Sequence, residues 1–119
     1  MDFDSAIDAH SKWKVRLRAV IAGEDKLSPA LVGAEDHCDL GRWIHGEGMR
    51  YSDSPFYKTL RTEHAQFHKC AAEVVSKSNA GNRPAAEALM AAGGAFSRAS
   101  QATIGAIMKM KSEFKIKAG

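Results

Sequence analysis

The sequence is poor in cysteine and proline and has no long apolar run; two Cys and three Pro occur among 119 residues. Two thiols form at most one disulfide, which excludes the disulfide-rich scaffold of many small secreted proteins. No segment approaches the roughly 18 to 20 apolar residues that span a bilayer, and Met1-Asp-Phe-Asp lacks the basic and apolar regions of a signal peptide. We therefore expect a cytoplasmic location, reduced thiols and no membrane contact by this domain.

The sequence also has little excess of one sign of charge. The net charge is only +3, and acidic residues are interspersed with basic ones through most of the chain. Nucleic-acid binders usually carry a denser basic stripe, so no nucleic-acid partner is expected. A chain of 119 residues is long enough for one modest core and too short for two, so residues 1–119 are predicted to form a single domain.

Apolar residues recur at helical spacing, and no segment alternates with the period of a β-strand. A first helix is predicted from about Asp4 to Ala22, ended by Gly23. A polar connection follows. The next predicted element is a short helix over residues 39–45, with Asp39 as its N-cap.

Two further long helices are predicted in the second half of the chain. Ser54-Pro55 supplies an N-cap followed by a proline at the first helical position. Asn82 is predicted to cap a last helix, which the pair Gly93-Gly94 weakens or kinks. Three long amphipathic helices and a short one predict an all-α fold, a small antiparallel helical bundle resembling a four-helix bundle. Either the short helix or a second copy of the chain would complete its core.

The segment His64-Ala-Gln-Phe-His68 carries two imidazoles four residues apart, which lie on one face of a helix and can bind one metal ion. In a zinc metalloprotease helix the residue after the first His is Glu, the general base. This chain has Ala65 at that position. The pair therefore predicts a metal that is bound without hydrolysis, and no enzymatic activity is expected.

His10 and Cys38 complete a candidate site. His10 shares a helical face with Ile7 and Leu17, so all three histidines are predicted to point into the bundle. Cys38 lies at the entrance of the short helix, where backbone amides and a metal ion would both lower the pKa of its thiol. One thiolate and three neutral imidazoles fill a tetrahedral zinc shell and leave no open position.

The spacing alone also fits histidines that are simply buried in the core with satisfied hydrogen bonds. His37, beside Cys38, is an alternative ligand. Cys70 lies two residues past His68, about 200° around the helix, so it is predicted to be a packed thiol outside the site. His45 faces away from the apolar side of the short helix in the same manner.

Three motifs occur in order, His10-Ser-Lys-Trp13, Cys38-Asp-Leu-Gly41-Arg-Trp43 and His64-Ala-Gln-Phe-His68. Together they closely resemble the chemoreceptor zinc-binding domain family, over nearly the whole chain. The resemblance implies a small helical bundle, often a homodimer, with one zinc ion (Zn2+) per chain. The ligands that it implies are His10, Cys38, His64 and His68. The other motif residues, Trp13, Gly41 and Trp43, are expected to pack around the site and hold the ligand side chains in place.

The resemblance further implies a bacterial sensory domain attached to, or acting on, a chemoreceptor or a diguanylate cyclase. The chain itself shows no receptor coiled coil and no cyclase domain, so a fused and a separate partner both remain open. We expect a regulatory response to the zinc level or to oxidation of the redox-sensitive Cys38 by an oxidant such as hypochlorous acid. The output would be chemotaxis signalling or cyclic-di-GMP synthesis.

Two other functions compete with this interpretation. In the first, the chain is a structural interaction bundle in which an inert zinc ion serves only as a staple. In the second, it is a di-iron bundle, which requires bridging carboxylates and often Glu-x-x-His. None of the residues three positions before the five histidines is acidic, and these are Ile7, Ala34, Arg42, Arg61 and Ala65.

Overall fold

The computed structural model describes residues 1–36 and 38–118, and the side chains of residues 1–36 and 38–114. Over these residues the chain forms, in order, α1 (Phe3–Ile21), α2 (Pro29–Gly33), α3 (Asp39–Ile44), the 3-10 helix η1 (Glu47–Tyr51), α4 (Pro55–Asn79), α5 (Arg83–Met90) and α6 (Ala95–Ala118). No described residue lies in a β-strand, which confirms the all-α prediction. None of the described helices has the length and hydropathy needed to cross a bilayer.

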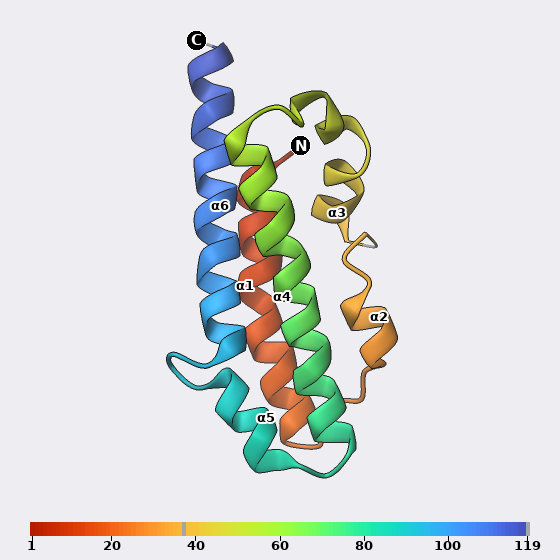
Figure 1. The fold of residues 1–119 in the computed structure, drawn as a ribbon. Helices are drawn as coiled ribbons and strands as arrows, with labels where there is room; N and C mark the ends of the chain where they lie inside the picture. Colours follow the sequence, from red (N-terminus) through yellow and green to blue (C-terminus); the bar gives the residue numbers. More distant parts are fainter. Residues whose placement is uncertain (37, 119) are drawn as a thin grey trace.

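The long helices α1, α4 and α6 lie side by side along the bundle (Figure 1). α1 and α4 run in the same direction, and α6 runs in the opposite direction. We call residues 28–36 and 38–51 the α2–η1 connection, since they contain α2, α3 and η1. It returns the chain from the end of α1 to the start of α4 and packs along α4 in the place of a fourth helix. Elements that follow one another along the chain thus run in alternating directions: α1, the connection, α4 and α6. This arrangement confirms the predicted antiparallel, four-helix-like bundle.

The ends of α1 and α4 follow local signals in the sequence. The side chain of Asp2 accepts a hydrogen bond from the backbone N–H of Ser5 and caps α1, and Gly23, with φ of 79°, follows its end. Ser54 caps α4 in the same way by accepting from the N–H of Phe56, with proline at the first position. Both helices begin within one residue of the predicted position, and α1 also ends within one residue of it.

The predicted last helix is wrong in one respect, because it is two helices. Asn82 caps α5 as expected, accepting from the N–H of Ala85 at 3.3 Å. The chain then turns through Gly93, whose φ of 79° is unfavourable for other residues. A Cβ atom on Gly94 would lie 2.4 Å from the carbonyl oxygen of Ala88. The glycine pair therefore ends α5 and allows a tight turn before α6, and does not merely kink one helix.

The connection between α1 and α3 is less irregular than predicted, since it contains α2. Ser28 and Pro29 stand at its start, the same pair of residue types that begins α4. The five residues of α2 are too few to display an apolar stripe, so periodicity did not reveal it. The helix η1 was not predicted either.

Two clusters of buried apolar residues form the core. The first core cluster contains Leu17, Val32, Phe67, Cys70, Ala71, Val74, Val75, Ala86, Met90, Phe96 and Ala99. The second core cluster contains Phe3, Ala6, Leu40, Trp43, Ile44, Tyr57, Leu60, Ala106, Ile107 and Met110. Along α1, His10 falls between Ala6 of the second core cluster and Leu17 of the first, and along α4, His64 falls between Leu60 of the second and Phe67 of the first. His68 directly follows Phe67, so the three predicted histidine ligands lie near the place where the clusters meet.

Candidate metal centre

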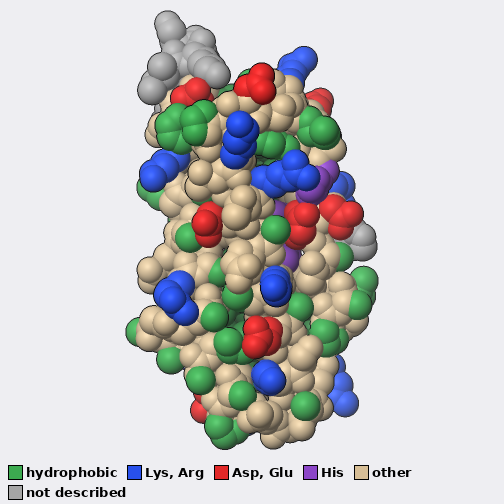
Figure 2. Space-filling model, in the orientation of Figure 1, with side chains coloured by type: hydrophobic (Ala, Val, Ile, Leu, Met, Phe, Trp, Pro, Cys, Tyr) green, Lys and Arg blue, Asp and Glu red, His purple; other side chains and the backbone are tan. Residues whose placement is uncertain are grey.

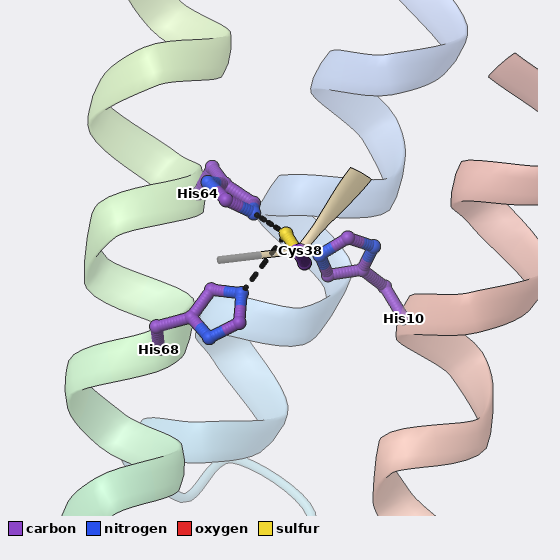
Figure 3. Close-up of side chains that lie close together, drawn as sticks. All are labelled: His10, Cys38, His64 and His68. Carbon is purple, nitrogen blue, oxygen red and sulfur yellow. Dashed lines mark hydrogen bonds between the residues drawn. The ribbon is translucent and has the colours of Figure 1, made fainter. Parts of the chain in front are cut away.

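The structure brings the three predicted histidines together inside the bundle. His64 and His68 lie one turn apart on α4, and His10 faces them from α1 (Figure 3). Their side chains are buried, with exposed fractions of 2% for His10, 0% for His64 and 3% for His68. The ring centroids of His10 and His64 are 5.1 Å apart, and those of His64 and His68 are 4.6 Å apart. Helical periodicity therefore predicted the direction of all three side chains.

Cys38 lies between the histidines at the start of α3 (Figure 3). Its Sγ lies 3.1 Å from Nε2 of His64 and 3.7 Å from Nε2 of His68. One ligand atom from each of the four residues lies within 4.8 Å of all the others. A metal ion with tetrahedral N and S coordination needs donor atoms gathered on this scale.

The cap of α3 differs from the prediction. Asp39 was expected to be the N-cap, but Cys38 holds that position in the structure, and its Sγ accepts a hydrogen bond from the backbone N–H of Gly41 at 3.3 Å. Asp39 is exposed instead and pairs with Arg42 on the same short helix. The backbone N–H of Gly41 and the imidazoles of His64 and His68 thus all contact the sulfur of Cys38.

Hydrogen bonds to the backbone fix two of the imidazoles. Nδ1 of His10 lies 2.8 Å from the carbonyl oxygen of Ala6, and Nδ1 of His68 lies 2.9 Å from that of Val32. A carbonyl oxygen can only accept, so each Nδ1 carries the proton and donates it. The neutral rings therefore leave their Nε2 lone pairs free for a metal.

Glu35 fixes the third ring, and the sequence analysis did not identify it. Nδ1 of His64 lies 3.2 Å from one carboxylate oxygen of Glu35, and Nε2 of His45 lies 2.7 Å from the other. A carboxylate that orients a metal-binding His is a common feature of metal sites. Glu35 is separated from His64 by 29 positions in the chain and belongs to no recognisable motif, so only the folded structure reveals this contact.

One buried nitrogen indicates that the site fits a metal. Nε2 of His10 is buried and has no hydrogen-bond partner among the described residues. An unpaired buried acceptor costs about 1 to 3 kcal/mol. A metal ion between the four ligand atoms would satisfy this nitrogen together with the sulfur of Cys38.

Burial keeps the three rings neutral. It lowers the pKa of His10 and of His68, and it lowers the pKa of His64 from 6.5 to about 2, with a further contribution from repulsion by the neighbouring histidines. Burial also raises the pKa of the Cys38 thiol, and the N–H groups of Gly41 and Leu40 offset this only in part. The backbone amides at the helix start thus lower the pKa of the Cys38 thiol as expected, but the opposing effect of burial is larger.

Of the other candidates, His45 and Cys70 lie outside the four-residue cluster. His37 is outside the described residues. His45 is exposed and contacts Glu35. Cys70 is buried in the first core cluster, as expected for a packed thiol.

The motif residues Trp13, Gly41 and Trp43 make different contacts in the structure. The ring of Trp13 meets that of His68 edge to face, with centroids 6.4 Å apart. Trp43 belongs to the second core cluster and stacks on Tyr51. A Cβ atom on Gly41 would lie 1.7 Å from the carbonyl oxygen of Glu35, so only glycine allows α3 to approach the preceding loop this closely.

The surface gives no sign of a nucleic-acid interface on the face shown in Figure 2. Basic, acidic and hydrophobic side chains are intermixed on this face, and no continuous basic stripe is visible there. A nucleic-acid backbone would favour a concentrated positive surface.

Comparisons with known proteins match the same part of the chain. The chemoreceptor zinc-binding domain model matches residues 10–75, which include all four clustered residues. The chain is also 27% identical over 78 residues to the diguanylate cyclase DgcZ of Escherichia coli (strain K12). This match covers 63% of the chain and 26% of the cyclase, so the chain corresponds to about a quarter of that protein. No solved structure gives a significant match.

Proposed function

Because the chain belongs to the chemoreceptor zinc-binding domain family, we propose that it binds one zinc ion through His10, Cys38, His64 and His68. The observation that carries this proposal is the orientation of the imidazoles. Each Nδ1 is occupied by a carbonyl or carboxylate oxygen, which leaves each Nε2 available at the cluster, and that of His10 is otherwise unpaired.

The donor set favours zinc over calcium or magnesium. Three imidazoles and a thiol are borderline to soft ligands, whereas Ca²⁺ and Mg²⁺ prefer oxygen. When bound, zinc would stabilise Cys38 as a thiolate and complete a four-coordinate shell. Four protein ligands leave no position for a reactive water, and Ala65 replaces the general base of zinc proteases, so we propose no catalytic activity.

The four residues tie three parts of the fold together. His10 belongs to α1, Cys38 to the α2–η1 connection, and His64 and His68 to α4. Residues that bind one ion couple its binding free energy to the positions of their elements. We therefore propose residues 1–119 as one regulatory unit whose α2–η1 connection changes its attachment to α4 when the site changes.

Cys38 is the proposed redox-sensitive residue. Its thiolate would react with hypochlorous acid to give the sulfenic acid and chloride. In this reaction the sulfur takes the hydroxyl group of the oxidant and loses its negative charge, and chloride leaves. The oxidised sulfur is a poorer ligand, so the link between α3 and α4 would weaken. Cys38 is half-buried whereas Cys70 is 3% exposed, which supports preferential reaction at Cys38.

We propose that this response regulates signalling in the bacterial cytoplasm. The similarity to a diguanylate cyclase supports an effect on cyclic-di-GMP synthesis, and the family name supports chemoreceptors as the other partner class. The partner would be fused to this unit or separate from it, and a homodimer would carry the signal between two copies.

Zinc analysis combined with oxidation tests this function. Protein purified without added metal should contain one zinc per chain, and Cys38→Ala should weaken zinc binding by more than the roughly 10- to 100-fold typical of lost supporting contacts. The control Cys70→Ala should retain zinc. Hypochlorous acid at a concentration equal to that of the protein should modify Cys38 and release zinc. The proposal would be contradicted if the purified protein contained no zinc and did not bind added zinc. It would also be contradicted if the oxidant modified only Cys70.

The inert zinc staple is the second candidate function. The nearly complete burial of the three histidines favours it, because buried ligands exchange slowly. It would give the same zinc content and the same effect of Cys38→Ala. Hydrogen exchange separates the two functions: the staple predicts unchanged exchange in residues 28–51 after oxidant treatment, and the sensor predicts faster exchange there.

A further inference from the structure

A cavity of about 480 Å³ lies between α1 and α3 and reaches two of the four proposed ligands. The residues that line it are Met1, Asp2, Ser5, Ala6, Ala9, His10, Cys38, Asp39, Leu40 and Arg42. His64 and His68 do not line it. A reactant in this cavity would therefore approach Cys38 from the α1 side, opposite to α4 (Figure 3).

The cavity-lining residues on α1 other than His10 have small side chains, namely Ser5, Ala6 and Ala9. Ser5 and Ala9 lie one turn apart and are both exposed, and Ala6 is buried. Pockets that bind small molecules commonly have volumes of about 300 to 1,000 Å³. The cavity therefore has room for a molecule of tripeptide size, much larger than the oxidant itself.

The other thiol of the chain, Cys70, is not placed to react with an oxidised Cys38. It contains only two cysteines, and Cys70 is buried in the first core cluster, where its sulfur accepts a hydrogen bond from Gln66. Cys38 packs against the second core cluster. An intramolecular disulfide is thus not available, and recovery of the sulfenic acid needs a thiol from outside the chain.

We propose that the cavity between α1 and α3 admits a low-molecular-weight thiol, of the size of glutathione, that reacts with oxidised Cys38. This inference rests on the proposed oxidation of Cys38. The thiol sulfur attacks the sulfenic sulfur, an S–S bond forms, and the hydroxyl group leaves as water with the proton of the thiol. A second thiol then attacks the outer sulfur of this mixed disulfide, which releases the Cys38 thiolate and a disulfide of the small thiol.

The variant Ala9→Phe tests the cavity, because it adds a large side chain at an exposed lining position without removing a proposed ligand. Ala102→Phe, at an exposed position on α6 away from the cavity, is the matched control. Ala9→Leu provides a smaller plug if the phenylalanine variant is poorly folded. Far-ultraviolet circular dichroism and zinc content establish that each variant retains its fold and its site.

The first measurement does not depend on redox sensing. Metal-free, reduced protein is treated with oxidised glutathione, a large probe, or methyl methanethiosulfonate, a small one, and modification of Cys38 is followed by mass spectrometry. Ala9→Phe should slow the large probe by about tenfold or more and the small probe by less than about twofold. Equal rates for Ala9→Phe and Ala102→Phe with the large probe would overturn the inference.

The second measurement follows recovery. Zinc-loaded protein is oxidised with hypochlorous acid, and reduced glutathione is then added. Wild type and Ala102→Phe should form the mixed disulfide at Cys38, and Ala9→Phe should form it about tenfold more slowly. If wild type forms no sulfenic acid, the proposed function fails while the first measurement still judges the cavity. If glutathione does not react and only a thioredoxin-type protein restores the thiol, the inference is wrong.

Discussion

Helix α4 packs against α6 on one side and against the α2–η1 connection on another, and different interactions hold the two contacts together. Between α4 and α6 the contact is mainly apolar: the rings of Phe67 and Phe96 lie 5.2 Å apart, and Leu60 and Ile107 are fully buried. The connection also buries Val32 and Leu40, but its links to the histidines of α4 are polar.

This difference predicts which contact responds to a signal. Burial of apolar surface does not depend on a metal ion or on the oxidation of a thiol. The polar links involve the proposed zinc ligands and their hydrogen-bond partners, so their strength depends on the state of the site. We therefore expect the α4–α6 pair to be the stable part of the bundle, and the connection to be the part whose attachment changes.

The largest expected effect comes from the apolar contact. Phe96→Ala should lower the free energy of unfolding by about 3 to 5 kcal/mol, because it removes a fully buried ring from the core. Chemical denaturation measures this loss, and the exposed residue Phe56 supplies the control, since Phe56→Ala should change stability by less than about 1 kcal/mol. Zinc affinity of the folded variant should stay within about twofold of wild type, and a large loss would show that the two contacts are coupled.

Removal of zinc should act on the connection. With free zinc at about 100 times its dissociation constant, binding adds about 2.7 kcal/mol to the free energy of unfolding, and a chelator should remove this contribution. Hydrogen exchange should then become faster in residues 28–51 before it does so in α4 or α6. The variant His10→Ala should show little response to the chelator. Uniform loss of protection throughout the bundle would contradict the distinction between the two contacts.

Loss of Glu35 should weaken the site by a smaller amount. Its carboxylate holds the ring of His64 and also contacts His45, so Glu35→Ala removes an orienting group without removing a ligand. Zinc affinity should fall by about 10- to 100-fold in a competition titration. Glu73→Ala, at an exposed position on α4, is the control and should bind zinc like wild type. Equal affinities for the two variants would show that Glu35 has no orienting role.

The smallest expected effect is the pH dependence of the metal-free protein. The pKa of His64 is lowered from 6.5 to about 2, so below pH 6.5 the unfolded chain takes up a proton that the folded chain does not. Stability should therefore fall with decreasing pH, and His64 alone should account for about 1 kcal/mol between about pH 7 and pH 5.5. In chelator, His64→Gln should show a shallower dependence. Parallel curves for the variant and wild type would contradict this cause.

Local signals in the sequence predicted the long helices and the direction of the buried histidines. His64 and His68 follow the apolar period of α4, and His10 follows that of α1, so their burial required no knowledge of distant contacts. The signals at Ser54-Pro55 and Asn82 were likewise local. These features depend on neighbours within one or two helical turns.

The missed features depend on contacts that the sequence pattern does not encode. The role of Cys38 as the cap of α3 arises because its sulfur lies near both Gly41 and the histidines, and an Asp in the next position is the more usual cap. Glu35 is important only because the connection runs beside α4. The break at Gly93-Gly94 depends on how closely the carbonyl groups of α5 approach the turn.

The distance along the chain between the clustered residues has a kinetic consequence. Cys38 is 26 positions from His64, and His68 is 36 positions from Val32, whose carbonyl it contacts. Closing such loops is entropically costly, and the polar links of the cluster compensate this cost less readily than the apolar contacts of the long helices do. The cluster is therefore expected to assemble late, after the long helices have docked. Interactions formed after the folding transition state slow unfolding and leave the folding rate nearly unchanged. Zinc would then determine how long the connection remains attached to α4, and have little influence on how fast the bundle forms.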